Sequence, residues 1–122
     1  MSLISKIRIP RSRSMLTAVT AEAWARTGQA KRAVDVISLV KPEDQELEQL
    51  RPQIYRSQAF AFAYAGDVKK SRQALRKLSA LDPRRLGGFL GKKGHPLLQK
   101  EARKLLEQSG AIPRQMQIQR RL

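Results

Sequence analysis

The chain contains no cysteine and only one histidine among its 122 residues. The lack of cysteine excludes disulfides, thiolate nucleophiles and zinc ribbons, and one histidine cannot supply a His-pair metal site or a histidine relay. Long apolar runs are also missing, because the longest, residues 59–65, falls well short of the ~18 residues that a membrane-spanning helix needs. The composition therefore argues against disulfide-rich, zinc-dependent and membrane-spanning proteins, and the length fits one small domain.

Acidic residues are few, and the charge is unevenly distributed. The 25 Lys and Arg residues outnumber the 10 Asp and Glu residues, so the formal net charge is +15. Residues 1–13 carry +4, residues 14–83 carry +3 and residues 84–122 carry +8. An anionic partner would relieve the self-repulsion of the two basic ends. RNA or another polyanion is the first expectation, because each phosphate contact releases counterions. An acidic protein, an anionic membrane surface and a purely solubilising role stay open.

Residues 1–20 are rich in Arg and Ser and contain no acid. Mitochondrial transit peptides have this composition, but Pro10 would interrupt their amphipathic helix, and the apolar core of a secretory signal is missing. Pro10 and the alternating Arg and Ser residues instead predict an extended basic arm over residues 1–12. We expect a cytoplasmic protein, with the mitochondrial matrix as the alternative.

Apolar residues at three- and four-residue spacing predict a succession of helices. The first is expected to start with Ser14 as its N-cap and to end at Gly28, which can adopt the left-handed conformation. Its predicted buried stripe consists of Met15, Leu16, Val19, Ala23 and Trp24. A second helix follows from residue 30, and Pro42 ends it.

Residues 43–50 hold four of the acids and predict a short helix, because acids suit an amino-terminal turn. Pro52 fits the first position of the next helix, which we expect to end at Gly66. Within that helix, the sequence AFAFAYA at residues 59–65 alternates as a strand would. Its four alanines favour a helix.

Asp67 is the candidate N-cap of a helix over residues 68–81. The predicted buried side of this helix consists of Val68, Ala74, Leu75, Leu78 and Leu81. Residues 84–95 contain several glycines and predict a loop. Pro96 then begins a last helix, which extends to Ser109.

Two helix pairs repeat along the chain. Gly28 and Gly66 stand at corresponding turns, where AEAWARTGQAKRAVDVI parallels AFAFAYAGDVKKSRQAL. The shared features are small residues, an aromatic three positions later, the glycine, a second small residue and two large aliphatics. The positions are Ala21, Trp24, Gly28, Ala33, Ile37 and Val40 in the first pair, and Ala59, Phe62, Gly66, Ser71, Leu75 and Leu78 in the second. Helix pairs with a period of this length are typical of solenoids.

Over residues 14–83 this pattern resembles the tetratricopeptide repeat. The resemblance extends to Leu81-Asp82-Pro83, which closes the second repeat. It implies an all-α fold of two antiparallel helix hairpins, an α-solenoid fragment, with the helix over residues 96–109 as a cap. The expected organisation is a basic arm over 1–12, one helical domain over 13–109 and a basic tail over 110–122. A helical bundle without this family tie stays an alternative.

No residue pattern predicts catalysis. The sequence LGGFLGKK of residues 86–93 lacks the spacing and the hydroxyl residue of a phosphate-binding P-loop. His95 is interpreted as a loop or N-cap residue, and the acids of residues 43–48 lack the spacing of a calcium loop. We therefore expect a protein that is not an enzyme and that uses no metal, cofactor or small-molecule substrate.

The basic residues are the candidate binding residues. Lys69, Arg72 and Arg76 share one side of the predicted helix 68–81, and a phosphate-binding surface could continue from them. The predicted anion-binding residues are Lys69, Lys70, Arg72, Arg76, Arg84, Arg85, Lys92, Lys93, Arg11, Arg13, Arg120 and Arg121. Most aromatic residues are assigned to the core, whereas Phe89, between glycines and lysines, is a candidate base-stacking residue.

These features predict a scaffold that binds a partner protein and an anionic surface, RNA in a ribonucleoprotein assembly, through its basic arms. The contacts would be made to the RNA backbone, because the sequence contains no motif that reads bases. The alternative is a protein-only adaptor or complex subunit with an acidic protein partner.

Overall fold

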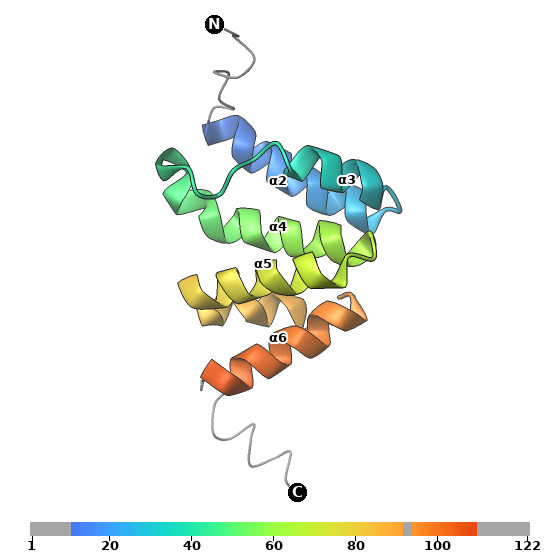
Figure 1. Cartoon of the computed structure of the whole chain (residues 1–122), viewed down its shortest axis with the longest axis vertical. Helices are drawn as coiled ribbons and strands as arrows, with labels where there is room; N and C mark the ends of the chain where they lie inside the picture. The colour runs from blue at the N-terminus through green and yellow to red at the C-terminus, as the bar shows by residue number, and fades with distance from the viewer. Residues whose placement is uncertain (1–10, 92–93, 110–122) are drawn as a thin grey trace, which may run out of the picture.

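The computed structural model describes residues 11–91 and 94–109, which form only helices and connecting turns (Figure 1). In chain order the elements are α2 (Arg11–Arg26), α3 (Ala30–Ile37), the 3-10 helix η1 (Gln45–Leu50), α4 (Arg51–Tyr64), α5 (Val68–Leu81), the 3-10 helix η2 (Pro83–Phe89) and α6 (Pro96–Ser109). No strand occurs in these ranges, so the all-α prediction is confirmed.

The helices are stacked as two hairpins and a cap. Helices α2 and α3 form the first antiparallel hairpin, and α4 and α5 form the second (Figure 1). Helix α4 packs against both helices of the first hairpin, and α6 packs against α5 and η2. The predicted arrangement of two hairpins with a carboxy-terminal capping helix is therefore confirmed.

The two inner turns have the same geometry. Gly28 and Gly66 adopt φ of +91° and +84°, and this left-handed conformation is unfavourable by about 1–2 kcal/mol for a residue with a Cβ. The next amide reaches back across each turn: Gln29 N–H donates to the Trp24 carbonyl at 2.8 Å, and Asp67 N–H to the Phe62 carbonyl at 2.9 Å. These are Schellman-type helix ends at matching positions of the two hairpins. Both predicted glycine stops are confirmed.

Helix α4 lies at the centre of the stack and is buried on several sides. Its buried residues are Ile54, Tyr55, Ser57, Ala59, Phe60, Ala61 and Ala63. Ile54 and Ala61 belong to the core shared with the first hairpin, whereas Phe60 belongs to the core shared with α5, η2 and α6. A helix enclosed in this way has no single apolar stripe, which explains its strand-like alternation. The helix prediction for residues 59–65 is confirmed.

Helix α2 differs from the prediction at its start and in its buried face. It begins at Arg11, so the extended arm predicted over residues 1–12 cannot reach beyond residue 10. Ser14 is a buried residue inside the helix, and its prediction as N-cap is wrong. The buried face consists of the small residues Ser14, Ala18, Ala21 and Ala25. Met15, Leu16 and Val19 are 39%, 66% and 47% exposed, and Ala23 is exposed as well, so their predicted burial is wrong. Trp24, the last member of the predicted stripe, is half-buried against the core of the first hairpin. Small residues allow α2 to approach its neighbours closely, and larger side chains do not fit there.

Two other boundaries also differ from the prediction. Helix α3 ends at Ile37, five residues before Pro42, where the Ser38 hydroxyl donates to the Val34 carbonyl at 2.7 Å. Residues 83–89 form η2 rather than a loop, because the Asp82 carboxylate caps the Arg84 N–H and Leu86 is fully buried. On α5, Val68 and Leu81 are exposed, so only the central part of its predicted buried side is correct.

The acidic connection between the hairpins forms the predicted short helix, as the 3-10 helix η1. The Asp44 carboxylate accepts from the Glu46 N–H at 3.1 Å and caps its start. The Arg51 guanidinium donates to the carbonyls of Pro42 and Asp44, which ties the connection to the start of α4. The segment thus has a structural role in joining the hairpins.

Candidate anion-binding strip and inter-hairpin hollow

Helix α5 carries the largest group of predicted anion-binding residues. The Asp67 carboxylate accepts from the Lys70 N–H at 3.1 Å and fixes the start of the helix, as predicted. From this start Lys69, Arg72 and Arg76 follow at three- and four-residue spacing, and all are exposed. We call these three residues the α5 strip. Helix α5 itself, residues 68–81, contains no carboxylate.

One member of the α5 strip is partly neutralised. Arg72 Nε lies 3.5 Å from an oxygen of Glu101 on α6, which is 7% exposed. This pair helps to hold the capping helix on the second hairpin. Among the described residues, Lys69 and Arg76 take part in no ion pair. Their charges are available to an external anion.

Lys70 lies beside the α5 strip and covers an aromatic ring. Its ammonium group is 5.5 Å from the centre of Phe62. The Arg32 guanidinium stands in the same relation to Trp24 in the first hairpin, at 5.4 Å. This cation–π pair recurs at matching positions of both hairpins.

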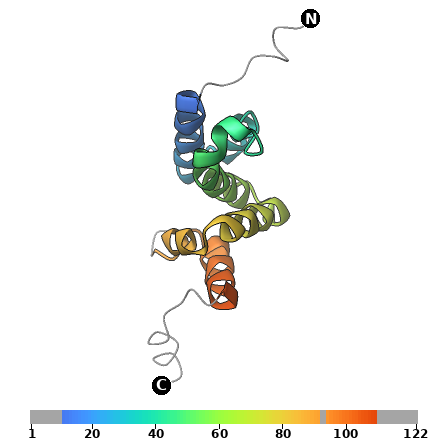
Figure 2. The same cartoon turned by 90° about the vertical axis from the view of Figure 1, so that its left-hand side faces the viewer.

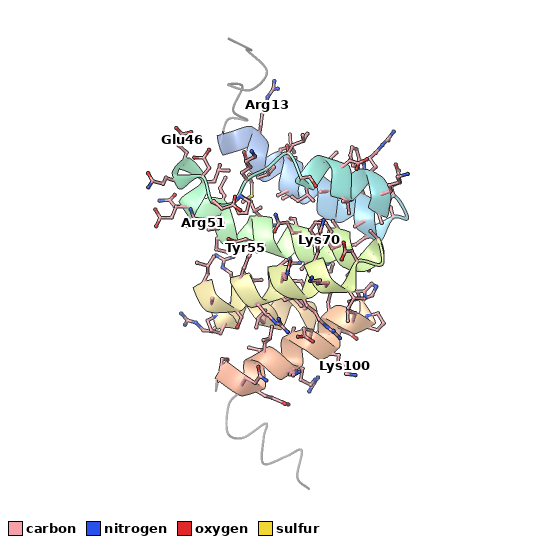
Figure 3. The ribbon with its side chains drawn as sticks, in the orientation of Figure 1. Arg13, Glu46, Arg51, Tyr55, Lys70 and Lys100 are labelled. Atoms are coloured by element: carbon pink, nitrogen blue, oxygen red, sulfur yellow. The ribbon has the colours of Figure 1, made fainter. Side chains whose placement is uncertain are left out.

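The remaining predicted residues are dispersed. Arg84 and Arg85 lie on η2, where both approach the Asp82 carboxylate, at 3.6 and 3.7 Å. Arg13 is exposed near the start of α2, at the opposite end of the stack from Lys100 on α6 (Figure 3). The predicted residues Lys92, Lys93, Arg120 and Arg121, the Arg11 side chain and most of the 1–12 arm lie outside the described part of the molecule.

Exposed cations on α6 were not among the predicted residues. Lys100, Arg103 and Lys104 are exposed, and the first two border a shallow depression beside Leu90 and Gln99. Their exposure was detectable in the sequence, because they alternate with the apolar positions of the helix.

A hollow of about 350 Å³ lies between the two hairpins and η2. Figure 2 shows α2 and η2 on the same side of the molecule, and α4 lies between them but farther from that side. The lining residues are Val19, Glu22, Pro52, Gln53, Arg56, Leu78 and Arg85. On α5, Leu78 is nine positions from Lys69, which places it roughly 180° around the helix at 100° per residue. The hollow and the α5 strip therefore face different sides of the molecule, and Arg85 belongs to the hollow.

An arginine–aromatic cluster borders this hollow. Arg56 Nε donates to Glu22 Oε1 at 2.9 Å, and its guanidinium lies 5.2 Å from the Phe60 ring centre and 5.4 Å from that of Phe89. Arg26 also pairs with Glu22, at 3.8 Å, and lies 4.4 Å from the Phe60 ring centre. The cluster joins α2, α4 and η2.

Phe89 lies on the core side of this cluster, and its ring is not available for stacking on a base. It is fully buried, with its ring 5.0 Å from that of Phe60, so the predicted base-stacking role is wrong. The Arg56 guanidinium lies close over Gly88, where a Cβ would lie 2.6 Å from Nη1 and would displace the end of the arginine side chain. The sequence could not reveal this, since the three elements meet only in the folded structure.

His95 has the predicted capping role. Its Nδ1 accepts from the Leu97 N–H at 3.1 Å at the start of α6, and its ring meets Tyr64 edge-on at 4.8 Å. In the described ranges, no group of three or more His, Asp or Glu residues could hold a metal ion. None of the described helices is long and apolar enough to cross a membrane.

Comparisons with protein-family models, with curated proteins and with solved structures find no match to this chain. The geometry of the two surfaces is therefore the basis for a functional assignment.

Proposed function

We propose that this protein is a non-enzymatic helical-repeat scaffold that binds a polyanion, RNA in a ribonucleoprotein assembly, and carries a partner protein on another face. The observation that carries the proposal is the α5 strip, where Lys69 and Arg76 are exposed without an ion pair in the described part of the chain. A strip of this kind on a protein of net charge +15 attracts phosphates by releasing their counterions.

The proposed contacts are made to the nucleic-acid backbone and not to the bases. The aromatic candidate for base stacking, Phe89, is enclosed in the core, and Phe62 is covered by Lys70. Lysine and arginine contacts to phosphates position a protein on RNA without reading its sequence. We therefore expect similar affinities for single strands of different sequence.

The test measures binding of the whole protein to a fluorescent uridine oligonucleotide by anisotropy at several salt concentrations. The variant is Lys69→Gln with Arg76→Gln, which leaves the Arg72–Glu101 pair intact. We expect binding about tenfold weaker at moderate salt, and a salt dependence whose slope falls by about 0.7 for each lost phosphate contact.

The matched control is Lys31→Gln with Lys41→Gln, which removes two exposed cations from the first hairpin and its linker. An equal loss in both variants would show that only net charge matters. If the protein binds no RNA, and a partner stays attached after nuclease treatment of an extract, the protein-only adaptor with an acidic protein partner replaces this proposal.

A further inference from the structure

The hollow between the hairpins combines apolar walls with arginines. Val19 and Pro52 supply the accessible apolar part of the lining, with Val19 47% exposed, whereas Leu78 lies buried beneath it at 1% exposure. Met15, one helical turn before Val19 on α2, is 39% exposed. Apolar side chains left exposed beside a concave surface are typical of a contact site.

The arginines of the hollow have unused donors. Arg56 uses Nε for Glu22, and among the described residues neither of its terminal nitrogens makes a hydrogen bond, although its side chain is only 29% exposed. Arg85 Nε approaches Asp82 at 3.7 Å, which is longer than a hydrogen bond. A guanidinium has five N–H donors, and a carboxylate matches two of them at once.

The charge of the lining favours an anion that is small and carried on an apolar segment. Around the hollow, the three arginines Arg26, Arg56 and Arg85 are opposed by two carboxylates, Glu22 in the lining and Asp82 beside Arg85, so a small positive charge remains. A continuous phosphate backbone suits this surface less well than the α5 strip, because its run of charges exceeds the small net positive charge around the hollow and would leave the apolar lining unused.

We infer that the hollow is the docking site for an acidic segment of the partner protein. A carboxylate of that segment pairs with Arg56 and Arg85, and a neighbouring apolar side chain packs on Val19 and Pro52. This inference rests on the protein-binding part of the proposed function, and it uses a different face of the molecule from the RNA-binding part.

The experiment titrates the whole protein with a fluorescent peptide in which Asp and Glu residues flank a central Leu-Phe pair. A peptide with Asn and Gln in place of the acids is the matched control ligand. We expect Arg85→Gln to weaken binding of the acidic peptide about tenfold, since it removes a charged partner. Lys69→Gln, which removes the same charge from the other face, should change it by less than about twofold.

A second variant tests the apolar contact of the proposed docking site. Val19→Ala keeps the helix and exposes no new charge, and it should weaken the acidic peptide severalfold while leaving RNA binding unchanged. Amide chemical shifts of the wild-type protein should change around Val19, Gln53 and Arg56 when the peptide is added. These three readouts locate the peptide without depending on one substitution.

The inference fails if both peptides bind equally, if neither binds, or if Arg85→Gln and Lys69→Gln weaken the acidic peptide to the same extent. It also fails if a uridine oligonucleotide displaces the peptide competitively, because the hollow would then belong to the polyanion surface. Failure of the RNA proposal is recognised separately, by oligonucleotide binding that is insensitive to the α5 strip variant.

Discussion

Gly66 and Gly87 show how differently two glycines contribute to the fold. Gly66 has φ of +84°, whereas Gly87 has no positive φ, and a Cβ on Gly87 would meet nothing within 4 Å. We expect Gly66→Ala to lower the free energy of unfolding by about 1–2 kcal/mol, because alanine resists the left-handed conformation. Gly87→Ala should be neutral or raise it by up to about 1 kcal/mol, through a lower entropy of the unfolded chain.

Urea denaturation followed by circular dichroism measures both variants. Equal effects of the two substitutions would contradict the assignment of Gly66 as the residue that closes the second hairpin. Gly28→Ala provides an internal comparison, since its turn has the same hydrogen bonds, and it should resemble Gly66→Ala.

Several residues whose role is local could be predicted from the sequence, whereas Ser14, predicted as an N-cap on the same grounds, lies inside α2. Gly28, Gly66, Asp67 and His95 act on backbone groups a few positions away, and their predicted roles are confirmed. Phe89 could not be predicted, because its burial depends on Phe60, a residue on another helix. Its neighbouring glycines and lysines gave no sign of that contact.

Helix α2 shows why the buried face of an element was harder to predict than its existence. The sequence offers a stripe of large apolar residues and a stripe of small ones, and the structure buries the small ones. Helix α5 was easier, because its cations mark the exposed side and leave Ala74, Leu75 and Leu78 for the core. The residue pattern alone identifies the buried face of a helix when charged residues mark the opposite side. Helix α2 has few charged residues, so its buried face could not be identified in this way.

The same substitution on opposite faces of α2 tests this assignment. Ala21 is fully buried, whereas Ala23 is exposed. We expect Ala21→Leu to lower the free energy of unfolding by about 1–3 kcal/mol, because the added atoms overfill a close helix contact. Ala23→Leu should change it by less than about 0.5 kcal/mol. Thermal and urea melts of the two variants give the comparison, and the reverse order would restore the large apolar stripe as the buried face.

At the scale of the whole molecule, the two binding surfaces differ in how far the sequence revealed them. The α5 strip is a property of one helix, so residue spacing was sufficient to predict it. The hollow is lined by residues of four elements, among them Val19, Arg56 and Arg85, and it exists only because η2 and α2 lie on the same side of α4. Such a site follows from packing and not from a motif.

The unbalanced charge of the whole molecule also has a measurable consequence for its stability. In the described part of the chain, the carboxylates of Glu22, Asp82 and Glu101 already pair with arginines, whereas the net charge of the protein is +15. Repulsion among the remaining cations opposes folding, and salt screens it. If exposed ion pairs contributed more than this repulsion, salt would destabilise the protein instead.

We expect the thermal midpoint to rise by a few degrees when sodium chloride is increased from about 0.01 M to about 0.1 M, which shortens the Debye length from about 30 Å to about 10 Å. The rise should be smaller in the variant with Lys69→Gln and Arg76→Gln, because it has two fewer cations to screen. Differential scanning calorimetry at matched pH measures both proteins. A midpoint that falls with salt, or an equal rise in both proteins, would mean that repulsion at the α5 strip does not limit stability. Lys69 and Arg76 would then carry their charges without lowering the stability of the fold.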